Sequence, residues 1–126
     1  MQLFIYLQAK PIEEIHYTHP LRNELKKNFP GLTLFEADQA SDQYQLAIGK
    51  DLIKEAKKVV LWIEGNKEVR IGVLAGLFEA LRKKEQPIMT IFDGEHPVLA
   101  KMLSLFDTEI HQEGDLELIK NFLTIE

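Results

Sequence analysis

The chain of 126 residues contains no cysteine, which excludes a thiolate nucleophile, a cysteine-ligated zinc site and a disulfide. Long apolar runs are also missing, since none approaches the roughly 20 residues that a transmembrane helix requires. The segment that begins at Gln2 has no basic n-region and no small-residue cleavage site, so we expect no signal peptide. These absences predict a soluble, cytoplasmic protein, and the length predicts one domain that spans residues 1–126.

Charge of one sign is not concentrated anywhere in the sequence. The net charge is −5, and the lysine pairs stand at the ends of predicted helices, where the helix dipole favours cations. No aromatic residues lie between those lysines to stack nucleic-acid bases. We therefore expect neither nucleic acid nor a membrane among the partners of this chain.

The loops that cradle phosphates are absent as well. The first apolar segment ends in Gln8-Ala9-Lys10-Pro11 where a dinucleotide-binding protein carries Gly-x-Gly-x-x-Gly, and no Walker-type loop occurs. The spacing His16-x-x-His19 is one that can ligate a metal on a helix, but this pair lies in a loop bounded by prolines. We expect a helix cap there, no metal, and no resident cofactor.

The most informative feature that is present lies in the middle of the chain. An apolar run over 59–63 ends in Glu64-Gly65, and a second run over 87–92 ends in Asp93-Gly94, with an amphipathic helix predicted over 72–84 between them. Strands that are apolar on successive residues are typical of parallel sheets covered on both faces. The segment is therefore predicted to be a β-α-β unit.

The rest of the chain continues this alternation. Predicted strands cover 2–8, 32–37, 59–63, 87–92 and 108–111, and predicted helices cover 20–29, 42–58, 72–84, 97–106 and 115–122. Right-handed crossovers allow few arrangements of five such units. We predict an α/β fold, a three-layer α-β-α sandwich on a five-stranded parallel sheet in the flavodoxin-like order 2-1-3-4-5.

In that order the ligand crevice lies at the carboxyl ends of strands 1 and 3. The carboxylates of Asp38, Glu64 and Asp93 are expected to lie together at this edge. Their like charges would raise one another's pKa values, which would prepare one of them as a general acid or base. The alternative is that acidic residues at loop starts simply remain solvated. The candidate ligand-binding residues are Gln8, Lys10, Asp38, Asn66, Arg70, Gly72, Asp93 and His96, and the candidate catalytic residues are Glu64 and Glu79.

Other readings of the same residues remain open. The small residues Gly72, Gly76 and Ala80 recur at helical spacing, and packing against a neighbouring element explains them more simply than a ligand cradle. His96 precedes Pro97 at a helix start and could either cap that helix or donate to an anion. Tyr6 and Trp62 are expected in the core.

The segment 50–91 resembles the nucleoside 2-deoxyribosyltransferase-like group, whose fold TIR domains share in outline. The likeness rests on the run that ends in Glu64-Gly65, the turn Arg70-Ile71-Gly72-Val73 and the exit Glu85-Gln86-Pro87-Ile88, together with the opening Ile5-Tyr6-Leu7-Gln8-Ala9. The resemblance implies a nucleoside or nucleotide ligand. The position of the family's nucleophilic glutamate is Gly76 here, and Glu79 stands almost one helical turn later.

Three hypotheses follow. In the first, the chain is a non-catalytic or degenerate member of that group, with Lys10, Asn66 and Arg70 holding an anionic part of the ligand. In the second, it is an interaction module that forms a homodimer through the helix at 72–84 or the helix at 97–106. In the third, it is an active N-glycosidase or deoxyribosyltransferase that uses Glu79 or Glu64.

Overall fold

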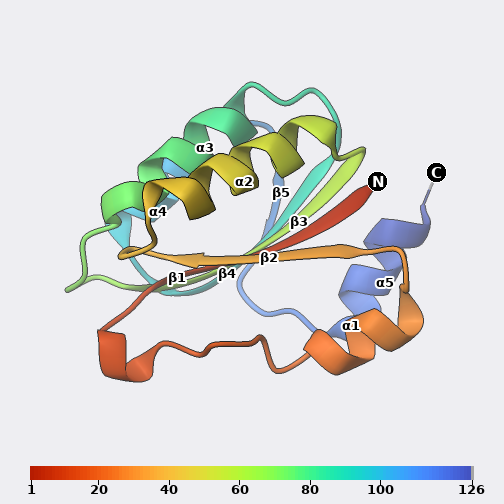
Figure 1. Ribbon diagram of the computed structural model, residues 1–126, viewed down its shortest axis with the longest axis horizontal. Coiled ribbons are helices and arrows are strands. Elements are labelled where there is room, and N and C mark those ends of the chain that lie inside the picture. The colour runs from red at the N-terminus through yellow and green to blue at the C-terminus, as the bar shows by residue number, and fades with distance from the viewer. Residues whose placement is uncertain (126) are drawn as a thin grey trace.

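A computed structural model, which describes residues 1–125, contains one five-stranded sheet (Figure 1). Every neighbouring pair of strands is parallel, and the order is β2-β1-β3-β4-β5. The strands are β1 (Gln2–Ala9), β2 (Thr33–Asp38), β3 (Lys58–Asn66), β4 (Ile88–Glu95) and β5 (Glu109–His111). The predicted α/β fold class and the predicted strand order are both confirmed.

Helices cover both faces of the sheet, as Figure 1 shows. On one face lie α2 (Gln43–Glu55), α3 (Ala75–Arg82) and α4 (Pro97–Leu103), and on the other lie α1 (Arg22–Asn28) and α5 (Leu116–Thr124). Two short 3-10 helices, η1 (Ile12–Glu14) and η2 (Gly72–Leu74), complete the secondary structure of the described residues. No helix within residues 1–125 is long and apolar enough to cross a bilayer.

The central strand β1 shows why the sheet is buried on both sides. Leu3, Ile5 and Leu7 point into the core under α2, α3 and α4, whereas Phe4 and Tyr6 point into the core under α1 and α5. All five side chains are at most 2% exposed. Successive residues of a strand face opposite sides, so a strand with two covered faces must be apolar throughout.

The strands continue further than the apolar runs that predict them. Residues 64–66 were expected in a loop, yet they extend β3, because Glu64 pairs with Asp93 and Gly65 pairs with Gly94 of β4. The backbone ladder does not require apolar side chains, so it runs on into the polar residues. The consequence is that the acidic residues belong to the rigid sheet edge.

The helices also differ from their predicted bounds: α4 ends at Leu103 instead of residue 106, and α5 covers Leu116–Thr124 instead of 115–122. The helix expected over 42–58 ends at Glu55, because Ala56 is extended and Lys58 pairs with Gln2 in the sheet. The helix expected from residue 20 begins at Arg22, after a turn in which the amide of Arg22 donates to the carbonyl of His19. The helix expected over 72–84 is divided into η2 and α3 and ends at Arg82.

The starts of α2 and α5 follow the expected capping chemistry, whereas α1 and α3 begin without a side-chain cap. The carboxylate of Asp42 accepts a hydrogen bond from the amide of Gln45, and Asp115 caps α5 in the same way through Leu118. Such caps satisfy amides that have no partner inside the helix. They fix where α2 and α5 leave the carboxyl edge of the sheet.

Candidate functional site

A row of polar side chains crosses four strands at the carboxyl edge of the sheet. Asp38 of β2 is in register with Gln8 of β1, Gln8 with Glu64 of β3, and Glu64 with Asp93 of β4. Residues in register across a parallel sheet point to the same face, and this face is the one that α1 and α5 cover. The chain order therefore brings together four polar groups from distant parts of the sequence.

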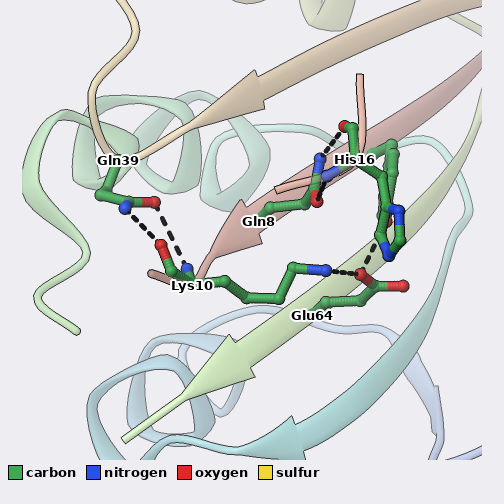
Figure 2. A network of polar contacts seen from close by, with 6 residues as sticks. Gln8, Lys10, His16, Gln39 and Glu64 are labelled. Carbon is green, nitrogen blue, oxygen red and sulfur yellow. Dashed lines mark hydrogen bonds and ion pairs between the residues drawn. The ribbon is translucent and has the colours of Figure 1, made fainter. Parts of the chain in front are cut away.

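Glu64 is the centre of a hydrogen-bonded group in this row (Figure 2). The Nζ atom of Lys10 lies 2.5 Å from Oε1 of Glu64, and the hydroxyl of Tyr6 donates to the same oxygen at 2.6 Å. The side chains of Lys10 and Glu64 are only 14% and 17% exposed. No donor within residues 1–125 occupies the second oxygen, Oε2, which leaves it available to a ligand hydroxyl or amine.

The protonation state of Glu64 differs from the expectation. Burial opposes ionisation, but the hydrogen bonds from Lys10 and Tyr6 outweigh it and hold the pKa of Glu64 below its usual value. The predicted rise of this pKa through like charges is thus wrong, because it omitted the ammonium of Lys10. Burial and the contact with Glu64 raise the pKa of Tyr6, so its hydroxyl stays protonated and donates.

A cavity of about 370 Å³ opens beside Glu64, and we call it the crevice. It lies at the carboxyl ends of β1 and β3, where the chain runs from the two strands to helices on opposite faces of the sheet. This is the topological switch point of the strand order. Three carboxylates and one ammonium face it, so a neutral or cationic ligand is favoured there over an anion. The lining residues are Lys10, Glu14, His16, Glu64, Gly65, Asn66, Asp93 and Gly94.

The side-chain amide of Gln8 holds the segment between β1 and α1 beside the crevice through two hydrogen bonds to the backbone of His16. This side chain donates to the carbonyl of His16 at 2.7 Å and accepts from its amide at 2.8 Å, as a neighbouring strand would (Figure 2). On the other side of Lys10, the amide of Gln39 donates to the Lys10 carbonyl at 2.6 Å. Gln8 is 2% exposed and acts as a positioning residue for the wall of the crevice.

Four buried rings, those of Phe4, Tyr6, His19 and Trp62, pack together in the core next to Glu64. The ring of His19 packs edge-on against Phe4, Tyr6 and Trp62, and its centroid is 4.2 Å from that of Trp62. Nδ1 of His19 accepts a hydrogen bond from the amide of Leu21, and the side chain is 4% exposed. Burial lowers the pKa of His19 to about 4, so the ring is neutral at pH 7.

Two glycines shape the floor where β3 and β4 end. Gly94 has a φ of 102°, and a Cβ atom there would lie 2.1 Å from the carbonyl oxygen of Gly65. A Cβ at Gly65 would lie 3.0 Å from His96 and Leu99. At Gly94 only glycine allows this close approach of β4 to β3, and at Gly65 the missing side chain lets α4 pack closely against the sheet.

Several predicted site residues lie elsewhere. Asp38 accepts from the amide of Ala40 and lines a separate cavity beyond Gln8, so it does not share the crevice with Glu64 and Asp93. Arg70 is exposed on the segment after β3 and does not line the crevice. Gly72 has a φ of 54° and packs against the carbonyl of Gln39, so its role in this structure is a turn.

Glu79 is outside the crevice as well. It lies on α3, its side chain is 52% exposed, and it pairs with Arg82 at 2.7 Å. His96 caps α4 through Nδ1, which accepts from the amide of Leu99, while Nε2 contacts the carbonyl of Val69 at 2.6 Å. The neighbouring small residue Gly76 packs against Lys50 of α2, which explains part of the small-residue stripe as packing within one chain.

Sequence reasoning missed three residues that the structure brings to the site: Tyr6, Glu14 and His16. Tyr6 was assigned to the core because it lies within an apolar strand, and only its hydroxyl reaches the edge. Its signal was its place two residues before Gln8, on the same face of β1. Glu14 and His16 carried no such signal, since the course of a loop is not encoded in a periodic pattern.

Comparison of the chain with protein-family models, with curated proteins and with solved structures finds no match. Within residues 1–125, no group of three or more histidine or carboxylate side chains is arranged to hold a metal ion. The functional argument therefore rests on the crevice and the residues that line it.

Proposed function

We propose that the crevice binds a small, hydroxyl-rich ligand of the nucleoside class, and that the chain is a divergent, non-catalytic relative of the nucleoside 2-deoxyribosyltransferase-like group. The observation that carries this proposal is the placement of Glu64. Its carboxylate is held ionised by Lys10 and Tyr6 while one oxygen remains unpaired beside a cavity. A fixed carboxylate of this kind accepts hydrogen bonds from sugar hydroxyls.

The charges of the crevice favour a nucleoside over a nucleotide. Among residues 1–125, Lys10 is the one lysine that lines the crevice, and its ammonium is already paired with Glu64. A phosphate would approach Glu14, Glu64 and Asp93 without a free cation to compensate for them. The sequence-based expectation that Lys10 and Arg70 hold an anionic portion is therefore the less favourable version of this proposal.

A thermal-shift panel of deoxynucleosides and their 5′-monophosphates tests the proposal. A ligand at a hundredfold excess over its Kd stabilises the folded state by about 2.7 kcal/mol, which is a readily measured rise in Tm. We expect deoxynucleosides to raise Tm more than the matching monophosphates. The variant Glu64→Gln should weaken binding about tenfold, because a charged acceptor is lost.

The control for this panel is Glu79→Gln, which changes a carboxylate of α3 outside the crevice. It should bind as the unchanged chain does. If no nucleoside shifts Tm, or if both variants weaken binding equally, the crevice is not the site and the proposal fails.

Glycosyl transfer through Glu64 is a second candidate, and the pKa of this residue favours it. An ionised carboxylate beside a cavity can attack a sugar carbon, and Asp93 stands next to it on β4. Incubation with deoxynucleosides and chromatography for the released base tests this function. Turnover that survives in Glu64→Gln would rule out Glu64 as the nucleophile.

A further inference from the structure

A second cavity, of about 280 Å³, lies at the opposite edge of the molecule, where α2 and α3 end. Its floor is apolar: Ile53 is 1% exposed, and Ala80 packs against the core. Three lysines, Lys54, Lys83 and Lys84, stand around it together with Glu85 and Gln86. We call it the lysine-rimmed cavity.

The ammonium groups of this rim are poorly compensated. Lys83 has a carboxylate at 3.8 Å, Glu79, whereas no carboxylate within residues 1–125 forms an ion pair with Lys54 or Lys84. Nζ of Lys84 has one contact, a weak one of 3.3 Å to Oε1 of Gln86. Burial lowers the pKa of Lys84, which means that its charge is partly desolvated without a partner.

Helix dipoles provide a partial explanation for lysines at this place. The carboxyl end of each helix carries about half a negative charge and attracts cations within its last turn. Glu79 lies between Lys83 and Arg82 and so compensates a fourth cation as well. Two helix ends, Glu85 and Glu79 together offset about three of the four positive charges. A positive excess therefore remains over an apolar floor, in a chain whose net charge is −5.

We propose that the lysine-rimmed cavity binds a small organic anion, a phosphate or carboxylate carried on a short apolar or aromatic body. The apolar body would cover Ile53 and Ala80, and the anionic group would lie between Lys54 and Lys84. Its volume of about 280 Å³ is just below the range of about 300–1,000 Å³ typical of drug-sized ligands, which suits a small molecule of this kind. The site is independent of the crevice, which is acidic and favours neutral ligands.

Calorimetric titration of the full chain with phenyl phosphate, inorganic phosphate and phenol tests this inference. We expect phenyl phosphate to bind most tightly, because it alone combines an anion with an apolar body, and we expect added salt to weaken it. Lys84→Met and Lys54→Met, which keep an unbranched apolar stem, should each weaken binding about tenfold.

The matched control is Lys26→Met, which removes a lysine from the last turn of α1, outside the lining of the lysine-rimmed cavity. It should leave the affinity for phenyl phosphate unchanged. Amide shifts on titration should be confined to residues 53–54 and 80–86. Equal binding of inorganic phosphate, equal losses in Lys26→Met and Lys84→Met, or no binding at all would overturn the proposal.

Discussion

Acidification should destabilise this protein through one residue, His19, before its carboxylates begin to titrate. The ring is buried among Phe4, Tyr6 and Trp62, and burial lowers its pKa from 6.5 to about 4. Between these two pH values the unfolded chain binds the proton and the folded chain does not. Stability therefore rises with pH across this window and is complete above about pH 6.5.

The size of the effect follows from the two pKa values. At the low-pH limit the difference amounts to about 3 kcal/mol, and about 2 kcal/mol of it is already lost at pH 5. The pKa of Glu64 is lowered as well, so its contribution is also lost on acidification, but only at pH values below the ordinary carboxyl pKa of 4.5. The window from pH 7 to pH 5 therefore reports mainly on His19.

Urea unfolding at several pH values measures this slope directly, and Trp62, the single tryptophan of the chain, provides the fluorescence signal. In His19→Asn, whose amide oxygen can still accept from Leu21, the free energy of unfolding should change much less between pH 7 and pH 5. His16→Asn, which alters an exposed side chain held only through its backbone, should keep most of the slope, because the charge of His16 is the smallest of the causes that shift the pKa of His19. An unchanged slope in His19→Asn would refute the assignment of a buried neutral histidine.

Other predictions concern the crevice itself. Gly94→Ala should lower the free energy of unfolding by about 3 kcal/mol or more, because its φ of 102° and the facing carbonyl of Gly65 exclude a Cβ atom. Gly31→Ala, where a Cβ atom would meet open space, should lower it little, and thermal unfolding of both variants measures the difference. Lys10→Met should raise the pKa of Glu64, which a carbon-13 titration of the carboxyl group measures; an unaltered pKa would contradict the ion pair. Tyr6→Phe should raise the same pKa by a smaller amount, since it removes one neutral donor and leaves the ammonium; a larger rise would reverse this ranking.

The fold could be predicted from the sequence because its signals are local and repeated. Apolar runs such as Val59–Ile63 in β3 mark strands buried on both faces, and polar residues after them mark the carboxyl edge. The ends of the strands could not be predicted in the same way. Glu64, Gly65 and Asn66 have no apolar pattern, and only pairing with β4 makes them strand.

The site was predicted in part, for a comparable reason. The strand order alone brings Lys10 and Glu64 to one edge, and the structure places them in contact. The sequence could not show that the hydroxyl of Tyr6 reaches Glu64, because a partner 58 residues away depends on the register of β1 and β3. The exposed pair of Glu79 and Arg82 is different, because residues three apart on a helix are neighbours on its surface, and the structure places the two side chains 2.7 Å apart.

The most direct test of the central claim is an amide NMR titration of the full chain with a deoxynucleoside. Gly65 and Gly94 lie on the floor of the crevice, and their backbone amides should shift in a saturable way, together with that of His16 on its wall. Residues 53–54 and 83–86 at the opposite edge should not respond. Saturable shifts at that edge with none at Gly65 and Gly94, or no shifts anywhere, would contradict a ligand site at the carboxyl ends of β1 and β3.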